Sequence, residues 1–420
     1  MPRIRHYFVA AILCCAGVLA PLIALGASPL TLGDVINRAL KFAPAAELAA
    51  AQRDLNAAKL LETRAPLYPT IFANADYNQS PGYDQVITNR GLTMGQLALG
   101  YTAYDGGRRA AQARAARYAS QAAVLGLNAA RSQIIFDATV AYFDLMHERE
   151  LETELRANLG RLTRYTAIVE SLERSGRAIA NDILKIRAVR DSAELTLAST
   201  DEAAAHASLV LGSMIGEFDN SDLRVVENSR LPTPPTGDIR GNPAVKAAER
   251  QVQSARLLME AARAERSPTF KIALTSGWEG VDPPKTFGHH LGASYDGALF
   301  VPIFQGGLVR SHIDEALAGR NAAIAQQRQI ELELKRDLAD ALNHYRSANR
   351  RLEILARSQS TANDAFALDW TRFLGGGNVT LLEVTDAYQL AENLRLGRFD
   401  AEFAVRQAAA QAEFVSGATR

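Results

Sequence analysis

The sequence predicts a mainly α-helical fold with a transmembrane β part, built from two copies of one helix–hairpin–long helix cassette. Three observations predict it: motifs that return about 200 residues later, two long stretches without proline, and paired runs of strand length. The returning motifs are Ala43-Pro44-Ala45 with Asn242-Pro243-Ala244, Tyr68-Pro69-Thr70 with Ser267-Pro268-Thr269, and Asp105-Gly106-Gly107 with Gln305-Gly306-Gly307. Chance matches would not keep this spacing, so the motifs indicate an internal duplication.

The first copy of the cassette is expected over residues 28–219. It begins with a helix at 31–65 and continues with a strand pair over 70–104. A long helix over 108–175 and a return helix over 178–213 complete it.

The second copy is expected over residues 241–417, after a connector at 220–240 that contains three prolines. Its elements are expected in the same order: a helix over 240–266, a strand pair over 269–304, a long helix over 308–374 and a return helix over 378–416.

The two long helices follow from the distribution of proline. None occurs between Pro81 and Pro232, or after Pro302, and both gaps are rich in Ala, Arg, Glu and Leu. Each helix would be about 100 Å long. Helices of this length need partners, and the two shorter helices of each copy, placed end to end, match the long one. We therefore expect a uniform helical wall.

The strand pairs have membrane dimensions. Each run is close to the roughly 9–11 residues that a tilted strand needs to cross a bilayer. Apolar Phe270, Ile272 and Leu274 alternate with Lys271 and Thr275. An ordinary soluble hairpin is the alternative. Four strands cannot close a barrel, and open edges in lipid are costly, so several chains would share one barrel. Two chains give eight strands and three give twelve, and this argument does not choose between them.

Residues 1–27 are expected to be a cleaved signal peptide, with a basic start, an apolar run and the small residues Gly26-Ala27-Ser28. An uncleaved membrane anchor is the alternative. The only cysteines, Cys14 and Cys15, lie inside this segment without a small residue just before them, so lipid attachment is not expected. A mature chain without thiols has no disulfides.

The charge is balanced, with 46 basic and 46 acidic residues, so no nucleic-acid partner is expected. Ser, His and Asp are scattered, and no glycine loop for phosphates precedes a helix; we therefore expect no enzyme and no cofactor. The pair His289-His290 is the one candidate metal site, and solvated loop residues are the favoured interpretation. No metal is expected.

The order of these pieces resembles TolC-type outer-membrane efflux proteins. The motifs that carry the resemblance are the proline-preceded strand pairs, the Gly-Gly turns and the stretch Leu382-Glu383-Val384-Thr385-Asp386-Ala387, and they span both halves. The resemblance implies a homotrimer with a twelve-stranded β-barrel in the outer membrane, continued by a periplasmic α-helical barrel. It implies an exit duct of a tripartite efflux or type I secretion assembly. Its partners would be a periplasmic adaptor (membrane fusion) protein, an inner-membrane pump and outer-membrane lipid.

Three carboxylates are candidate entrance residues. Glu383 and Asp386 are three apart and share one face of a helix, and Asp182 occupies the equivalent place in the first copy. The resemblance implies that they face the axis at the periplasmic entrance, where crowded like charges attract cations. Solvated surface acids are the alternative. A basic latch would have to use Lys185, Arg187 or Arg372.

The helical tips are the second candidate site. Glycines end both long helices, and the resemblance implies that the adaptor docks there. The residues expected at this surface are Arg174, Gly176, Arg177, Gly375, Gly376, Gly377 and Asn378.

Two competing interpretations lack a membrane channel. A periplasmic adaptor carries one long helical hairpin flanked by small β-domains, whereas this chain has two hairpins and membrane-length strand pairs. A soluble coiled-coil scaffold would treat the strands as accidental. The exported substrate is not indicated by the sequence.

Overall fold

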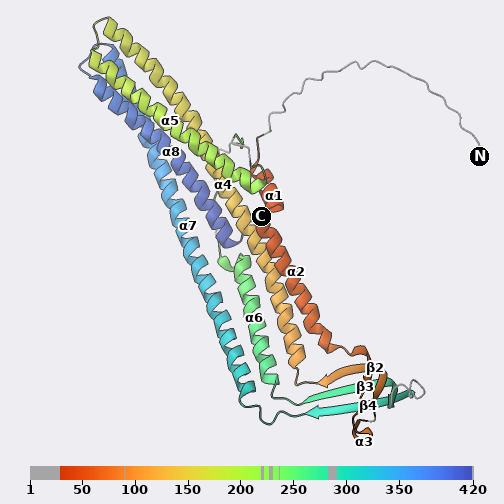
Figure 1. Ribbon diagram of the computed structural model, residues 1–420. Coiled ribbons are helices and arrows are strands. Elements are labelled where there is room, and N and C mark those ends of the chain that lie inside the picture. The colour runs from red at the N-terminus through yellow and green to blue at the C-terminus, as the bar shows by residue number, and fades with distance from the viewer. Residues whose placement is uncertain are drawn as a thin grey trace, which may run out of the picture.

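The computed structural model describes residues 29–88, 90–218, 222–226, 230–235, 237–281 and 291–418. A long helical bundle runs from a four-stranded sheet at one end to two turns that connect paired helices at the other (Figure 1). The expected signal peptide and the pair His289-His290 lie outside the described residues.

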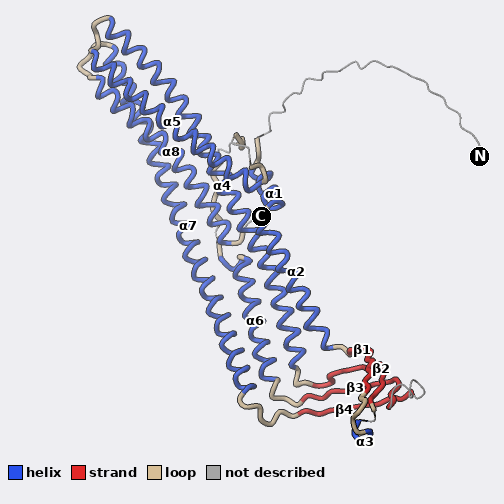
Figure 2. The backbone as a smooth tube through the Cα atoms, in the orientation of Figure 1, coloured by secondary structure: helices blue, strands red, loops and turns tan. Residues whose placement is uncertain are grey.

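Two long helices form the frame of the molecule. They are α4 (Arg108–Arg174) and α7 (Leu308–Leu374), each of 67 residues. Each is followed by a return helix of 36 residues, α5 (Ala180–Ile215) and α8 (Leu381–Ser416). α5 packs against α4, and α8 packs against α7, so that each long helix and its return form a hairpin (Figure 2).

The helix expected over 31–65 is wrong as a single element. The structure divides it into α1 (Leu32–Phe42) and α2 (Pro44–Arg64). Ala43, between them, has an extended backbone (φ −69°, ψ 115°). The cause is Pro44, because proline forces the residue before it out of the helical region and then serves as the first residue of a new helix.

Near the sheet the helices form one row. α2 packs against α4, α4 against α6 (Pro243–Ala264), and α6 against α7. α2 and α7 are therefore the two edges of this row, as Figure 1 shows. Two short 3₁₀ turns, Ala65–Leu67 and Ile239–Gly241, lie just after α2 and just before α6.

The sheet is antiparallel throughout, with strands in the order β1-β2-β3-β4. The bounds are β1 (Thr70–Gln79), β2 (Gly91–Tyr104), β3 (Thr269–Val281) and β4 (Leu291–Phe300). The expected strand end at residue 304 is wrong, because β4 stops two residues before Pro302, which has no N–H to give to a ladder. A helical turn, α3 (Gln85–Thr88), follows β1.

The register gives the sheet two different faces. Directly paired residues share a face, and one row across all four strands is Ile71, Leu99, Leu274 and Tyr295. A row on the opposite face is Asn74, Gln96, Gly277 and Gly292. One face is thus mainly apolar, and the other carries small and polar residues.

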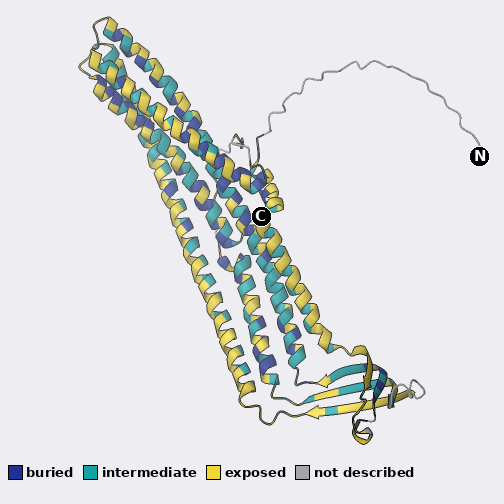
Figure 3. Ribbon diagram, viewed as in Figure 1, coloured by how far each residue is buried: buried dark blue, intermediate teal, exposed yellow. Residues whose placement is uncertain are grey.

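Burial is concentrated in the half of the bundle away from the sheet (Figure 3). One core joins α1, α4 and α5 midway along the molecule, around Val35, Leu145 and Leu211. A second lies near the helical turns, where α4, α5, α7 and α8 meet. α7 is largely exposed along the half that lies near the sheet. In the described part of the chain, no helix is both long and apolar enough to span a membrane.

Candidate functional site

The two hairpin turns lie side by side at the end of the molecule opposite the sheet (Figure 1). Both turns contain a glycine with a left-handed backbone conformation. Gly176 has φ 73° and Gly376 has φ 75°, the left-handed conformation that ends a helix most easily at glycine. The next N–H reaches back five residues in each case, Arg177 to the Leu172 carbonyl and Gly377 to the Arg372 carbonyl. The turns are therefore matching Schellman motifs.

The structure places all seven expected tip residues at this end. Arg174, Gly176, Arg177, Gly375, Gly376, Gly377 and Asn378 are all exposed. The two turns also touch, because the Arg177 guanidinium donates to the Leu374 carbonyl at 3.5 Å. The surface is thus one continuous patch from two hairpins that are far apart in sequence.

Two of the three expected entrance carboxylates, Asp182 and Glu383, lie in the first turns of the return helices. Glu383 forms a capping box, in which its carboxylate accepts from the Thr380 N–H (2.7 Å) and its own N–H donates to Thr380 Oγ1 (3.3 Å). Asp182 accepts from the Ile179 N–H at 3.2 Å. Asp386 lies one turn further along α8 and is exposed.

Each cap leaves part of the carboxylate's acceptor capacity unused. The structure brings Glu383 and Asp386 together on one helix, and it places Asp182 on α5 at the same end of the bundle. No hydrogen bond joins Asp182 to the other two among the described residues. Of the three candidate latch residues, Arg187 is bound to Glu170 at 2.6 Å within its own hairpin.

An aromatic core supports the tips. Tyr165 of α4, Phe366 and Trp370 of α7 and Tyr388 of α8 pack with the centroids of contacting rings 4.8–6.3 Å apart. Ile186 adds α5 to the same core. The two hairpins are therefore one four-helix unit near the tips, and the exposed surface above it has a rigid base.

A buried polar network, which the sequence did not reveal, joins α4 to α8 below this core. The Tyr388 hydroxyl donates to Asn158 Oδ1, and Arg161 contacts both Glu154 (2.7 Å) and Glu392 (3.0 Å). Burial raises the pKa of Tyr388 to about 12, although the Arg161 guanidinium opposes the shift. Burial also raises the pKa of Glu392, against the opposing effect of Arg161.

The signal for this network is weak in the sequence. Glu392 and Arg395 are three apart on α8 and pair at 2.7 Å, but such pairs usually lie on the surface. The partners on α4 are more than two hundred residues away, so only the packing of the hairpins brings them together.

A second set of buried charges lies midway along α4 and α8. The His147 ring stacks on Phe403 (centroids 4.8 Å apart), and its Nε2 lies 3.3 Å from Asp400 Oδ1. Arg406 is buried, 3.6 Å from Glu150. Burial lowers the pKa of His147, and the carboxylate of Asp400 partly offsets this shift.

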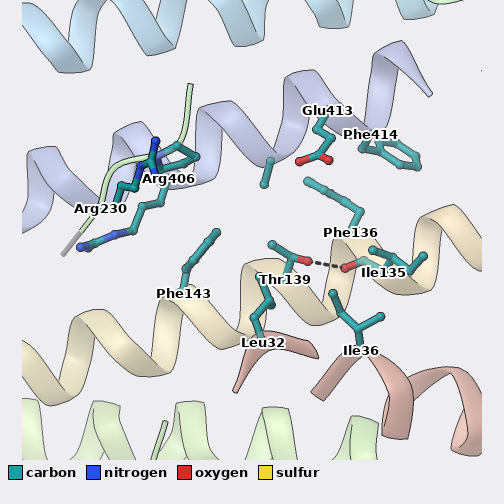
Figure 4. Close-up of a pocket in the computed structure, with 12 residues that line it drawn as sticks. Leu32, Ile36, Ile135, Phe136, Thr139, Phe143, Arg230, Arg406, Glu413 and Phe414 are labelled. Carbon is teal, nitrogen blue, oxygen red and sulfur yellow. Dashed lines mark hydrogen bonds between the residues drawn. The ribbon is translucent and has the colours of Figure 1, made fainter. Parts of the chain in front are cut away.

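One pocket of the described chain is near this level (Figure 4). It has a volume of about 260 Å³. Its walls come from α1, α4, α8 and the connector, and Figure 4 shows the guanidiniums of Arg230 and Arg406 away from the aromatic side chains of Phe136 and Phe414. The Thr139 hydroxyl donates a hydrogen bond to the Ile135 carbonyl at 2.7 Å. The described residues include no group of three His, Cys, Asp or Glu that would hold a metal.

Comparison with known proteins relates the sequence and the fold of the chain to one family. Residues 239–418 match the model of the family described as outer membrane efflux protein. The chain is 27% identical over 286 residues to the pyoverdine export outer membrane protein OpmQ of Pseudomonas aeruginosa, a match that covers 64% of this chain. The chain spans 59% of the length of that relative.

Solved structures share the fold. The outer-membrane channel OprN superimposes with a TM-score of 0.84 at 19% identity, covering 92% of this chain and 90% of that one. The outer membrane protein VceC of Vibrio cholerae gives 0.81 at 18% identity, covering 92% and 96%. The mainly helical fold class expected from the sequence is confirmed. The C-terminal part of the chain thus matches the outer membrane efflux protein family, and the chain has the fold of solved outer-membrane channels, in agreement with the TolC-type family that its sequence resembles.

Proposed function

We propose that the chain is one protomer of an outer-membrane exit duct, which carries small molecules or proteins across the outer membrane as part of a tripartite efflux or type I secretion assembly. The match to the outer membrane efflux protein family supports a place in the outer membrane, with an extension into the periplasm. The observation that carries the proposal is a two-faced sheet with two unpaired edges, joined directly to helices that end in tips at the far end.

The two faces suit a wall between lipid and water. Transmembrane strands alternate between an apolar side toward lipid and a polar side toward the lumen. The apolar face here is widely exposed, with Ile71 at 72% and Tyr295 at 80% of full exposure. A soluble monomer rarely leaves so continuous an apolar surface uncovered. Lipid is therefore the proposed neighbour of this face.

The two edges require more chains. Among the described residues, β1 and β4 each have one side without a strand partner, and unpaired backbone groups in lipid cost several kcal/mol each. Joining β4 of one copy to β1 of the next removes every edge once the ring closes. Three copies give the proposed twelve-stranded barrel, with α2, α4, α6 and α7 of each copy continuing it as a helical barrel.

An internal duplication supports this architecture. The pairing of Thr70 with Gly100 and Gln79 with Gly91 returns as Thr269 with Phe300 and Trp278 with Leu291. The two long helices have equal lengths, and so do the two return helices. We infer that residues 28–219 and 241–417 are two copies of one cassette, so that each chain supplies two similar sectors of the wall.

The tips are proposed as the docking surface for a periplasmic adaptor that connects an inner-membrane pump. Their exposure, their contact across the two hairpins and the rigid aromatic base below them support this role. OpmQ is named for pyoverdine export, and by analogy this chain would serve as the exit of an export system. No catalytic role is proposed.

The entrance is proposed to be acidic, lined by Asp182, Glu383 and Asp386 from each chain. Asp182 and Glu383 lie in the first turns beside the tips, and Asp386 lies one turn further along α8, which supports it. Negative charges that face one axis attract cations and disfavour anions. The caps on Asp182 and Glu383 hold the carboxylates at this end of the bundle.

A charge-neutralising pair of substitutions tests the duct and its entrance. The amide in Glu383→Gln still accepts from the Thr380 N–H, so the helix cap is kept while the charge is removed. We expect the double variant Glu383→Gln, Asp386→Asn to lower the cation-to-anion permeability ratio in planar bilayers by about threefold or more, and to weaken block by divalent cations.

The control is Asp364→Asn, which removes a charge from an exposed position on α7 of the same hairpin. It should leave selectivity and block unchanged. Equal selectivity in all three proteins would remove the entrance assignment but leave the duct. Absence of any conductance from purified wild-type protein would contradict the duct itself.

A further inference from the structure

The two edge strands, β1 and β4, face opposite ways in the sheet and so can pair antiparallel between copies. We propose that β4 of one copy pairs with β1 of the partner subunit in one defined register, the register that β2 and β3 have within the chain. This inference rests on the proposed function, which supplies the second copy, and adds the residue-by-residue contact between copies.

The register within the chain is strictly repeated. Adding 199 to the numbers of β1 and 200 to those of β2 converts each β1–β2 pair into a β3–β4 pair, from Thr70 with Gly100 (Thr269 with Phe300) to Gln79 with Gly91 (Trp278 with Leu291). All ten pairs follow this rule. The two hairpins are thus geometrically equivalent units.

β2 and β3 join these two units. Their pairing is the one example in the described sheet of how the second strand of one hairpin meets the first strand of the next. A ring of equivalent hairpins repeats this junction, and between chains the strands that form it are β4 and β1. Adding 200 to each β2 number and subtracting 199 from each β3 number in the β2–β3 pairs therefore predicts which residues of β4 and β1 pair between copies.

The conversion gives specific partners. Leu97 with Ser276 becomes Gly297 with Tyr77 of the partner subunit, and Leu99 with Leu274 becomes Leu299 with Ala75 of the partner subunit. On the opposite face, Ala98 with Thr275 becomes Ala298 with Asp76 of the partner subunit.

The predicted partners are complementary in size. Gly297 would lie opposite Tyr77 of the partner subunit. Because glycine has no side chain, the exposed aromatic ring of that tyrosine would pack over the backbone of Gly297. The chain already contains such a pair, because a Cβ on Gly95 would lie 2.1 Å from the ring of its partner Trp278. Glycine opposite a large aromatic ring is therefore a feature of both junctions.

The faces also agree. Leu299 and Ala75 of the partner subunit both belong to the apolar face, whereas Asp296 would meet Asn78 of the partner subunit on the polar face. A slip of one residue would turn every apolar side chain of one strand toward the polar face of the other. A slip of two residues keeps the faces but places Tyr295 opposite Tyr77 of the partner subunit, and separates Gly297 from that ring.

The helices extend the same contact. α4 follows β2, α6 precedes β3, and these two helices pack closely, with the Ser254 hydroxyl donating to the Ala115 carbonyl at 2.9 Å. The equivalent helices between copies are α7 and α2 of the partner subunit. Both carry exposed leucines, such as Leu61 (67%) and Leu308 (52%). The proposed register covers these side chains.

Engineered cysteine pairs test the register directly. The background replaces Cys14 and Cys15 by serine, so that the introduced thiols are the only ones in the chain. Two in-register pairs are Ala75→Cys with Leu299→Cys and Asp76→Cys with Ala298→Cys. Opposed residues alternate between hydrogen-bonded and non-hydrogen-bonded sites, so one of these neighbouring pairs has the shorter Cα separation.

The matched control pairs Ala75→Cys with Gly297→Cys, on the same face but shifted by two residues. That shift adds about 6.6 Å along the strand and takes the thiols out of bonding distance. After oxidation, we expect at least one in-register pair to give about tenfold more covalent dimer and trimer on non-reducing gels than the shifted pair.

Two outcomes overturn the proposal, and they differ in their consequence. Detergent-solubilised oligomers that crosslink best through the shifted pair, or through neither in-register pair, would disprove the register and leave the duct intact. Variants and parent that all run as single chains by native mass measurement would disprove the register and the duct together.

Discussion

At the scale of single residues, the acids that we propose for the entrance would have two roles, which one experiment has to separate. Glu383 and Asp182 hold the first turns of their helices, and simple replacement by alanine would cost about 0.5–2 kcal/mol through the lost cap. A change of selectivity in such a variant would not be attributable to charge. Amide substitutions keep the acceptor, which is why the proposed test relies on them.

His147 makes the stability of the folded protein depend on pH. Desolvation lowers its pKa from the ordinary 6.5; Asp400 and Asp144 oppose the shift, and Arg406 adds to it. The neighbouring Glu148 has a pKa raised by burial. The unfolded chain binds a proton to His147 more readily than the folded chain does. Stability that is present above pH 6.5 is therefore lost as the pH falls toward the lowered value.

We expect His147→Gln to reduce this acid sensitivity. Between about pH 7.5 and pH 5.5, the parent should lose more of its unfolding free energy than the variant, because only the parent has to keep a buried imidazole neutral in this range. The measurement is the urea midpoint of the purified protein at both pH values. His312→Gln is the control, because this histidine is partly exposed on α7 beside Glu265. Identical pH profiles for parent and His147→Gln would contradict the assignment.

Some residue-level features were predictable and others were not. The spacing of Glu383 and Asp386 predicts a shared helix, and both lie on α8. The contacts of Tyr388 with Asn158 and of Arg161 with Glu392 were not predictable. They connect α4 with α8, and helix spacing describes only neighbours on the same helix.

At the scale of elements, prolines and glycines determine where the chain changes direction. Pro44 divides the first helix, and Pro302 follows the end of β4. Both residues were visible in the sequence, and both wrong predictions ran across them. The turns at Gly176 and Gly376 follow from the same residue chemistry, since glycine adopts positive φ without a steric penalty.

The glycines at the second tip provide a matched pair of substitutions. Gly376 has φ 75°, whereas Gly375 has φ −78° and ordinary helical geometry. We expect Gly376→Ala to destabilise the protein by roughly 1–2 kcal/mol, because a Cβ is strained in the left-handed region. Gly375→Ala should be neutral or slightly stabilising. Urea unfolding measures both effects. Equal changes in the free energy of unfolding would show that the left-handed glycine of the Schellman turn does not contribute to the stability of the hairpin.

At the scale of the whole molecule, lengths and repeats in the sequence predict more than local propensity does. The run of residues without proline predicts a helix longer than most globular proteins contain, and α4 and α7 each extend for 67 residues. The pairing of β2 with β3, which makes one sheet of two hairpins, depends on how α4 and α6 lie together and has no local signal.

The proposed duct therefore requires one property that we infer for the chain: a sheet that is complete only with strands from other copies. The most direct test is the mass of the purified particle in mild detergent, measured by native mass spectrometry after removal of the micelle. The account predicts three chains per particle, and dissociation when the detergent is replaced by a denaturing one with heating. A stable single chain that remains dispersed in water without detergent would contradict it.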